Sequence, residues 1–463
     1  MSSKLPNMTI ETLGPRRIPS PLGLGNEPGD DLADYLPDDQ RVLYHVSTRE
    51  TKPYLDRGED LPCFEAAGPR EHLYFDPSKL KAGIVTCGGL CPGLNNVIRG
   101  IVLALHFGYG VRTILGFKYG YEGLVPKYKH PVIELTPDAV VDIHRLGGTV
   151  LGTSRGSQEA SEMVDTLERL GLGILFCIGG DGTMRGALAV HEEIRKRGLR
   201  IGVVGVPKTI DNDIMYIEKS FGFETAFSVA CEAIRAAHVE ATGARNGIGL
   251  VKLMGRNSGY IAANAALAER DVNLVLVPEQ DFDLDAPSGL LAVLERRILD
   301  RHHAVIVVAE GAGQRHLQAS SAVDPSGNVR LSDIGVFLRD RIREHFVRKG
   351  TGVDVKYIDP SYIIRSVPAN PSDAVYCGYL SQHAAHAGMA GKTGLAVGQW
   401  NGQFTHVPLS AVTSGRRSIS LEGPLWMSVL EATGQPFSML NNDPHGYAPG
   451  EGRRTHLPGY AEK

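Results

Sequence analysis

Two carboxylates two residues apart, Asp211 and Asp213, follow an apolar run at residues 201–206. Lys208 and Thr209 precede them in the segment Pro-Lys-Thr-Ile-Asp-Asn-Asp at residues 207–213. A carboxylate can accept the proton of an alcohol, and a nearby ammonium group can hold a negative phosphoryl group. The segment therefore favours phosphoryl transfer to a hydroxyl group. The alternative is a solvated acidic turn with a surface lysine.

A second candidate site is the segment Gly-Gly-Asp-Gly-Thr at residues 179–183. It follows the apolar run 174–178 and precedes a segment with helical periodicity, so it is expected to join a buried strand to a helix. Glycines expose backbone N–H groups, and a helix N-terminus attracts anions, so the segment is typical of a phosphate cradle. Asp181 can serve a magnesium ion, which takes few protein ligands. An ordinary tight turn with a capping aspartate is the alternative.

Basic residues in turn contexts are spread along the chain, namely Arg155, Arg256, Lys356 and Arg365. A sugar phosphate needs cations that converge from several loops, and arginine makes forked contacts with phosphate. Glu310 follows the apolar run 304–308 and can accept hydrogen bonds from sugar hydroxyls. Taken singly, each basic residue is more often a surface residue, and Glu310 fits a structural role equally well.

The elements that must position these residues are short apolar runs, each followed by a glycine turn and a segment of helical periodicity. We expect strands at residues 83–86, 111–115, 174–178, 201–206, 248–253, 272–277 and 304–308. We expect helices from residue 95 and at residues 184–197, 260–268, 288–300, 332–349 and 372–387. The alternation predicts an α/β fold with two doubly wound, Rossmann-like domains, parallel-rich sheets and an N-terminal extension. Ligands of such sheets bind beyond the carboxyl ends of the strands, where the candidate segments lie.

The domain boundaries follow from changes in composition. Ten of the 27 prolines precede residue 78, where apolar periodicity is weak, so residues 1–78 are predicted to be the N-terminal extension. The first α/β domain is expected at residues 79–215 together with 391–425, and the second at residues 216–390. Residues 426–463 are expected to form a C-terminal tail.

The composition excludes several classes of protein. A net charge of -4 shows no basic excess for nucleic acid, and no apolar run reaches the length of a membrane span. The first residues lack the plan of a secretory signal. The six cysteines form no Cys-x-x-Cys pair, which favours reduced thiols in the cytoplasm and no zinc site. The segment Gly-Lys-Thr-Gly at residues 391–394 lacks the upstream glycine of a P-loop.

With these segments in hand, the chain resembles the phosphofructokinase family from about residue 83 to about residue 407. The ordered set of motifs carries the resemblance: Gly88-Gly89 with residues 92–95, residues 179–183, residues 209–213, Met254-Gly255-Arg256, Glu310 and residues 362–365. Within the family, the chain looks like the long ATP-dependent enzymes of plants and trypanosomes. The resemblance implies a glycolytic 6-phosphofructokinase that phosphorylates the C1 hydroxyl of fructose 6-phosphate. A non-catalytic sugar-phosphate or nucleotide sensor is the alternative of another class.

The resemblance also implies the roles of the candidate residues. Asp211 is expected to be the general base, with Asp213 close by, Thr209 at the transferring phosphoryl group, and Lys208 and Arg155 stabilising its charge. The expected donor and magnesium residues are Gly88, Arg155, Gly156, Gly180, Asp181, Gly182 and Thr183, with Asp181 on the metal. The expected fructose 6-phosphate residues are Thr209, Ile210, Asp211, Met254, Gly255, Arg256, Glu310, Lys356, Tyr362, Ile363, Ile364 and Arg365. The first α/β domain is thereby expected to bind ATP and Mg²⁺, and the second to bind fructose 6-phosphate.

Two residues bear on the phosphoryl donor. Lys208 is more familiar in pyrophosphate-dependent members, so it favours pyrophosphate. Gly182 stands where those members usually carry an aspartate, whose charge would repel the α-phosphate of ATP. We give Gly182 more weight and expect ATP. The resemblance further implies an allosteric homotetramer, with a dimer as the alternative and Lys356 reaching a neighbouring subunit.

Overall fold

The computed structural model describes residues 5–27, 29–285, 287–318, 329 and 331–442. Within this part of the chain, two compact units form. The first contains the residues up to Thr225 and the segment Arg365–Arg417, and the second contains the residues between Ala226 and Ile364 and those from Ser418 onward. No helix of the described part is long and apolar enough to cross a membrane.

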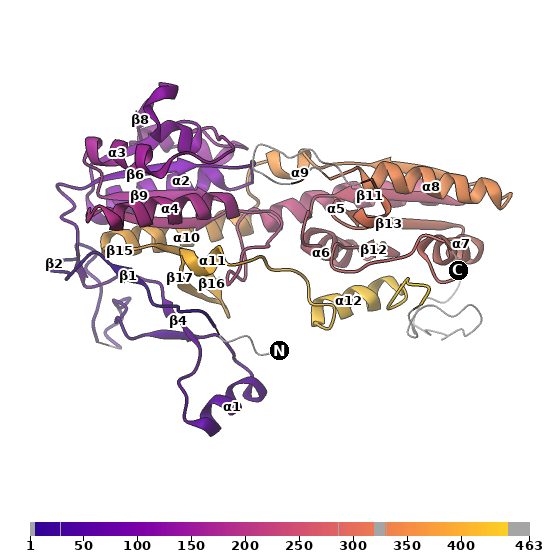
Figure 1. Ribbon diagram of the computed structural model, residues 1–463, viewed down its shortest axis with the longest axis horizontal. Coiled ribbons are helices and arrows are strands. Elements are labelled where there is room, and N and C mark those ends of the chain that lie inside the picture. Colours follow the sequence, from indigo (N-terminus) through magenta and orange to yellow (C-terminus); the bar gives the residue numbers. More distant parts are fainter. Residues whose placement is uncertain (1–4, 28, 286, 319–328, 330, 443–463) are drawn as a thin grey trace. The chain divides into compact units, whose positions relative to one another are not determined.

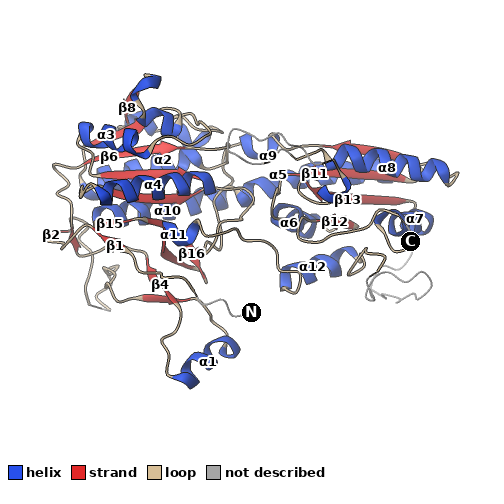
Figure 2. Cartoon of the chain, viewed as in Figure 1, coloured by secondary structure: helices blue, strands red, loops and turns tan. Residues whose placement is uncertain are grey.

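The first unit is built on a nine-stranded sheet (Figures 1 and 2). Its five central strands are parallel, and antiparallel strands extend it on both sides. In spatial order the strands are β3 (Arg41–Leu43), β4 (Cys63–Ala66), β17 (Gln403–Pro408), β16 (Leu395–Trp400), β10 (Gly202–Pro207), β9 (Ile174–Gly179), β6 (Lys81–Thr86), β7 (Thr113–Phe117) and β8 (Val132–Glu134). Two further pairs are β1 (Glu11–Thr12) with β15 (Lys392–Thr393), and β2 (Ile18–Pro19) with β5 (His72–Leu73).

Helices cover both faces of this sheet because its central strands are apolar on both faces. Leu175 and Cys177 of β9 belong to a core with α3 (Ala160–Leu170) and α4 (Asp181–Lys196). Ile174 and Phe176 point to the other face, where they lie against Gly388 of α10 (Pro371–Met389). The remaining helices of the unit are α1 (Thr48–Arg57), α2 (Leu94–Leu103), α11 (Leu409–Val412), a π-helical turn at Ala104–Tyr109 and 3₁₀ turns at Gly120–Leu124, Pro126–Tyr128, Asp138–Val140 and Ile143–Arg145.

The second unit has a fully parallel four-stranded sheet. Its strands, in spatial order, are β12 (Leu274–Leu276), β13 (His303–Ala309), β11 (Gly247–Leu253) and β14 (Asp354–Ile358). One face packs on apolar side chains of α7 (Leu290–Arg301) and α8 (Ile334–Arg348). The other elements are α6 (Tyr260–Glu269), α12 (Pro424–Thr433) and a 3₁₀ turn at Gln314–His316, while α5 (Phe223–Gly243) and α9 (Ile363–Ser366) each span a boundary between the units.

These units confirm the α/β class with parallel-rich sheets, but their limits differ from the predicted boundaries. Strands β3 and β4 of the expected extension pair with the large sheet, because Glu65 lies opposite His406 of β17. Helix α10 belongs to the first unit, since Ser381 donates a hydrogen bond to the carbonyl oxygen of Val97 in α2. Residues 443–463 of the predicted tail lie outside the described residues.

The segment that follows Arg417 belongs to the second unit. The side chain of Gln435 accepts a hydrogen bond from the backbone N–H of Val275 in β12 and donates one back to its carbonyl oxygen. Ile419 donates its backbone N–H to the carboxylate of Glu279. The chain therefore crosses between the units near residue 417, and α12 is an integral helix of the second unit.

Candidate active site

The loop after β6 is fastened to the loop that carries Arg155. The backbone N–H of Gly88 donates to the carbonyl oxygen of Ser154 at 3.1 Å, and the hydroxyl of Thr153 donates to the carbonyl oxygen of Gly88 at 2.5 Å. Gly88 has a φ of 85°, which a residue with a Cβ rarely adopts. The loops that carry Gly88 and Arg155 therefore come together although they are far apart in the sequence.

The segment predicted as a phosphate cradle forms the start of α4. Its helix begins at Asp181 with Gly180 as the N-cap residue, so the positive end of the helix dipole lies at these glycines. Thr183 is buried, and the hydroxyl of Tyr121 donates to its carbonyl oxygen at 2.6 Å. Gly182 is exposed, and a Cβ added there would meet nothing within 4 Å. The first turn of α4 is thus fixed by the contact of Thr183 with Tyr121, while Gly182 on the same turn is open to solvent.

Three cations gather at Gly89. The ammonium of Lys208 donates to the carbonyl oxygen of Gly89 at 2.5 Å. A Cβ built on Gly89 would lie 3.3 Å from a guanidinium nitrogen of Arg365 and 3.6 Å from one of Arg155. Lys208 is only 5% exposed, and this burial lowers its pKa. Positive charge from three separate loops converges at one turn, which suits a phosphate group.

The loop after β10 carries the paired carboxylates in a fixed conformation. The hydroxyl of Thr209 lies 3.2 Å from a carboxylate oxygen of Asp213, to which it donates, and it accepts the backbone N–H of Asp211 at 3.1 Å. Asn212 has a φ of 52°, and its side chain bonds the carbonyl oxygen of Glu218 and the backbone and hydroxyl of Ser220. These contacts fix the backbone on which Asp211 sits.

One functional candidate, Arg416, was not predicted from the sequence. Its guanidinium lies 3.0 Å from a carboxylate oxygen of Asp213 and 3.1 Å from one of Asp181. Arg185 makes a second ion pair with Asp181 at 2.6 Å. Arg416 lies 203 positions beyond Asp213, so no local spacing could indicate that the two residues meet.

A second set of predicted residues comes together in the second unit, at the carboxyl ends of β11 and β13. The backbone N–H of Gly311 donates to the carbonyl oxygen of Gly255, and that of Glu310 donates to Leu253. Gly255 has a φ of 131°, and a Cβ there would lie 2.5 Å from the carbonyl oxygen of Ser258. The two loops that carry Met254, Arg256 and Glu310 are therefore packed against each other.

The remaining predicted residues are more scattered. Tyr362 is 74% exposed, whereas the side chain of Ile364 is buried. Lys356 lies within β14, opposite Gly249 of β11, and pairs with Asp354 at 3.1 Å. Gly249 is five residues before Met254 in the sequence. Lys356 therefore lies in the middle of its strand, away from the loops that follow these strands.

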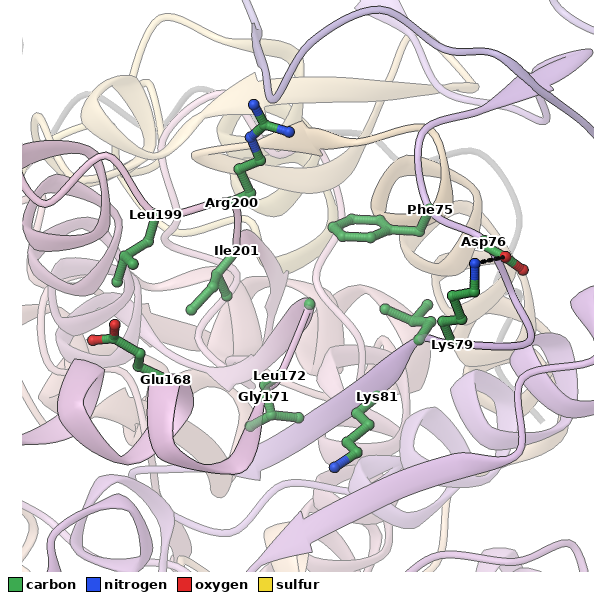
Figure 3. Close-up of a pocket in the computed structure, with 12 residues that line it drawn as sticks. Phe75, Asp76, Lys79, Lys81, Glu168, Gly171, Leu172, Leu199, Arg200 and Ile201 are labelled. Carbon is green, nitrogen blue, oxygen red and sulfur yellow. Dashed lines mark ion pairs between the residues drawn. The ribbon is translucent and has the colours of Figure 1, made fainter.

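The pocket in Figure 3, with a cavity volume of about 350 Å³, lies at the opposite end of the first unit's strands. Lys81 begins β6, and Ile201 immediately precedes β10, so these lining residues stand at amino ends. Its ion pair joins Lys79 to Asp76. The candidate catalytic side chains do not line this pocket. Among the described residues, no group of three or more His, Cys, Asp or Glu side chains is arranged to bind a metal.

Comparison with known proteins identifies the family. A sequence model described as Phosphofructokinase matches residues 81–388. A Borreliella burgdorferi protein named ATP-dependent 6-phosphofructokinase is 49% identical over 439 residues, which is 93% of this chain and 97% of that protein. The chain belongs to the phosphofructokinase family.

Other relatives extend this phosphofructokinase assignment to the predicted subgroup. ATP-dependent 6-phosphofructokinase 7 of Arabidopsis thaliana is 49% identical and is matched over 81% of this chain and 77% of its own length. ATP-dependent 6-phosphofructokinase of Trypanosoma cruzi is 48% identical, over 80% of this chain and 76% of its own length. The predicted likeness to plant and trypanosome phosphofructokinases is confirmed.

Solved phosphofructokinase structures share the fold. A pyrophosphate-dependent phosphofructokinase from Marinobacter aquaeolei superposes with a TM-score of 0.62 at 18% identity, over 76% of this chain and 91% of that one. Pichia pastoris phosphofructokinase in the T-state gives a TM-score of 0.60 at 20% identity, over 85% and 46%. At these identities the likeness supports the fold alone.

Proposed function

We propose that this phosphofructokinase is an ATP-dependent 6-phosphofructokinase of glycolysis. It transfers the γ-phosphoryl group of ATP to the C1 hydroxyl of fructose 6-phosphate and releases fructose 1,6-bisphosphate and ADP. Relatives of that name, 48–49% identical over most of this chain, support the reaction. The observation that carries the proposal is the loop of Thr209, Asp211 and Asp213, fixed at the end of a buried parallel strand in the unit where three cations surround Gly89.

Asp211 acts as the general base in this proposal. Its carboxylate takes the proton of the C1 hydroxyl as that oxygen attacks phosphorus. Thr209 contacts the transferring phosphoryl group, while its hydrogen bonds to Asp213 and to the backbone of Asp211 hold the loop in place. Lys208 and Arg155 stabilise the negative charge that spreads over the phosphoryl oxygens.

The donor nucleotide is bound by Gly88, Arg155, Gly156 and the first turn of α4. The open space around Gly182 supports ATP, because a nucleotide phosphate can approach the helix N-terminus there without meeting a side chain. Lys208 does not require pyrophosphate. Its ammonium joins the loops after β6 and β10 through Gly89, which gives it a structural reason to be present with either donor.

Asp181 is proposed to serve a magnesium ion. It is a carboxylate at a helix N-terminus whose ion pairs with Arg185 and Arg416 use one oxygen, so the ion would be held largely by phosphate oxygens and water. When bound, the ion neutralises charge on the donor phosphates. Asp181 itself orients that complex against the end of α4.

The acceptor fructose 6-phosphate is bound, in this proposal, by the residues that the family resemblance implies. The contributing residues are Thr209, Ile210, Asp211, Met254, Gly255, Arg256, Glu310, Lys356, Tyr362, Ile363, Ile364 and Arg365. Arg256 and Arg365 supply cations for the phosphate, and Glu310 accepts hydrogen bonds from sugar hydroxyls. Because Ile364 is buried, it contributes only its backbone. We further propose a cytoplasmic, allosteric homotetramer, in which Lys356 serves a neighbouring subunit.

Replacement of Asp211 by asparagine tests the catalytic proposal. Asparagine keeps the size of the side chain but cannot accept the proton, so kcat should fall by at least about 10²-fold, the usual size of a general-base effect. Fructose 6-phosphate binding, measured by calorimetry, should be largely kept. A kcat equal to that of the wild type would contradict the role of Asp211, and ligand binding without any turnover in the wild type would favour the sensor.

A further inference from the structure

Arg416 joins two acidic residues that stand on different elements. Asp181 begins α4, and Asp213 lies in the loop that carries Asp211. The two terminal nitrogens of Arg416 divide between them, with one 3.0 Å from Asp213 and the other 3.1 Å from Asp181. One forked guanidinium therefore joins these carboxylates through two separate nitrogens in a fixed planar geometry, whereas a lysine ammonium would have to contact both from one nitrogen.

The backbone around Arg416 is itself attached to the same loop. Arg416 forms an antiparallel bridge with Ile214, and the backbone N–H of Arg417 donates to the carbonyl oxygen of Asp213 at 2.8 Å. The side chain of Arg417 also donates to the carbonyl oxygens of Ile217 and Glu218. Arg416 thus moves with the loop after β10 and reaches from it to helix α4.

The two carboxylates are sheltered from water. The Asp213 side chain is 6% exposed and that of Asp181 is 13% exposed, whereas Arg416 is 33% exposed. Without Arg416, Asp213 would lose its ion-pair partner and be destabilised, while Asp181 would keep Arg185 but lose its link to Asp213. Removal of Arg416 would therefore let the start of α4 and the acidic loop move apart.

A short chain of contacts leads from Arg416 to the proposed base. Asp213 binds Arg416 through one carboxylate oxygen and accepts the Thr209 hydroxyl through the other. The same hydroxyl accepts the backbone N–H of Asp211. A shift of Asp213 is thereby transmitted to the backbone that carries the base.

We propose that Arg416 is a positioning residue for phosphoryl transfer, which holds the donor end of α4 and the base-bearing loop at a fixed separation. This inference rests on the proposed function. Arg416 lies beyond the residues matched by the family model, which end at residue 388. Its effect is on the geometry of Asp181, Asp213 and, through Thr209, Asp211.

Steady-state kinetics of Arg416→Gln and Arg416→Lys test the proposal. Arg416→Gln should lower kcat by about 10- to 100-fold, since a misplacement of about 1 Å can cost about 10²-fold, while the KM for fructose 6-phosphate changes less than about threefold. Arg416→Lys keeps the charge but not the fork, so its kcat should recover only in part. Thermal unfolding of each variant and calorimetric binding of fructose 6-phosphate establish that the fold is kept.

Arg185→Gln is the matched control, because Arg185 contacts Asp181 but bridges to no second carboxylate in the described contacts. The factor by which Arg185→Gln lowers kcat should be less than a fifth of the factor for Arg416→Gln. An equal loss in the two variants, or full recovery by lysine, would show that charge alone matters and would overturn the proposal. If the wild type is active and the kcat of Arg416→Gln lies within twofold of the wild-type value, this inference alone is overturned. If the wild type is inactive, both the proposed function and this inference are contradicted.

Discussion

At the scale of single residues, the donor loops combine tightly held and open positions. Lys208 is buried beneath the turn at Gly89, and Asp213 is held by Arg416 and Thr209. Gly182 differs, because it is exposed and has free space around the position of a Cβ. A substitution at Gly182 can therefore change what approaches the helix N-terminus without disturbing the core.

Gly182→Asp tests the assignment of donor specificity. The new carboxylate would lie beside Asp181 and repel the nucleotide phosphates, so kcat/KM for ATP should fall at least about tenfold, or about 1.4 kcal/mol. The KM for fructose 6-phosphate should change little. Gly182→Ala adds the Cβ without charge and should keep most ATP activity. Equal losses in the two variants would indicate a steric or folding effect and would contradict the electrostatic assignment.

Residues within one local motif were predictable, and residues joined only by the fold were not. Asp211, Asp213 and Thr209 stand within five positions, and the structure brings all three into one hydrogen-bonded loop. Arg416 has no such signal, because its partners Asp181 and Asp213 lie more than 200 positions earlier in the sequence. The roles of these residues in catalysis stay predictions.

At the scale of elements, the loop after β10 depends on the conformation of Asn212. Its positive φ places the backbone in the left-handed region, which asparagine tolerates better than most residues with a Cβ. Its side chain then ties the turn to Glu218 and Ser220. Asp211 and Asp213 flank this residue, so their separation follows from the local turn.

Asn212→Ala should destabilise the first unit by about 2–3 kcal/mol, from lost hydrogen bonds of about 1 kcal/mol each and added backbone strain. It should also lower kcat, because the carboxylates on both sides lose their support. Asn212→Asp retains an acceptor for Ser220 and should lose about half as much stability. Urea unfolding measures the difference. Equal stability of Asn212→Ala and the wild type would contradict this account of the loop.

The expected elements begin within about two residues of their predicted starts, apart from one helix, whereas α3 and α5 were not predicted. The expected helix at residues 184–197 begins at Asp181, because the backbone N–H groups of Thr183 and Met184 already bond to the carbonyl oxygen of Gly180. Glycines in this segment indicate a loop by propensity, but Gly180 serves as the N-cap residue. The earlier start brings the helix N-terminus directly to the proposed donor site.

At the scale of the whole molecule, the first unit contains a cluster of histidines that the proposed reaction does not use, with His406 buried and His383 and His386 partly buried. The ring of His383 in α10 stacks on Phe404 of β17, with centroids 4.4 Å apart, and lies beside His386. Burial, with His386, His406 and Arg70 nearby, lowers the pKa of His383 to about 3.

The domain boundaries could not be predicted from composition, because α10 and β17 belong with the first sheet through contacts distant in sequence.

His383 should make the fold acid-sensitive. The folded state holds the ring neutral down to about pH 3, while the unfolded chain binds a proton near pH 6.5, so stability falls as pH decreases below 6.5. His383→Gln cannot take up this proton. Between pH 6.5 and pH 4, the wild type should lose up to about 3 kcal/mol more stability than this variant. The free energy of unfolding is measured with urea at each pH. If it changes by the same amount with pH in the two proteins, the account is contradicted.

The choice of phosphoryl donor is the most direct test of the proposed function as a whole. The purified chain is supplied with fructose 6-phosphate, magnesium and either ATP or pyrophosphate, and formation of fructose 1,6-bisphosphate is measured. The account predicts that turnover with ATP is at least about tenfold faster than with pyrophosphate. The factor is the size expected for the charge repulsion that an aspartate at position 182 would exert on ATP, and that Gly182 avoids. Faster turnover with pyrophosphate would contradict it.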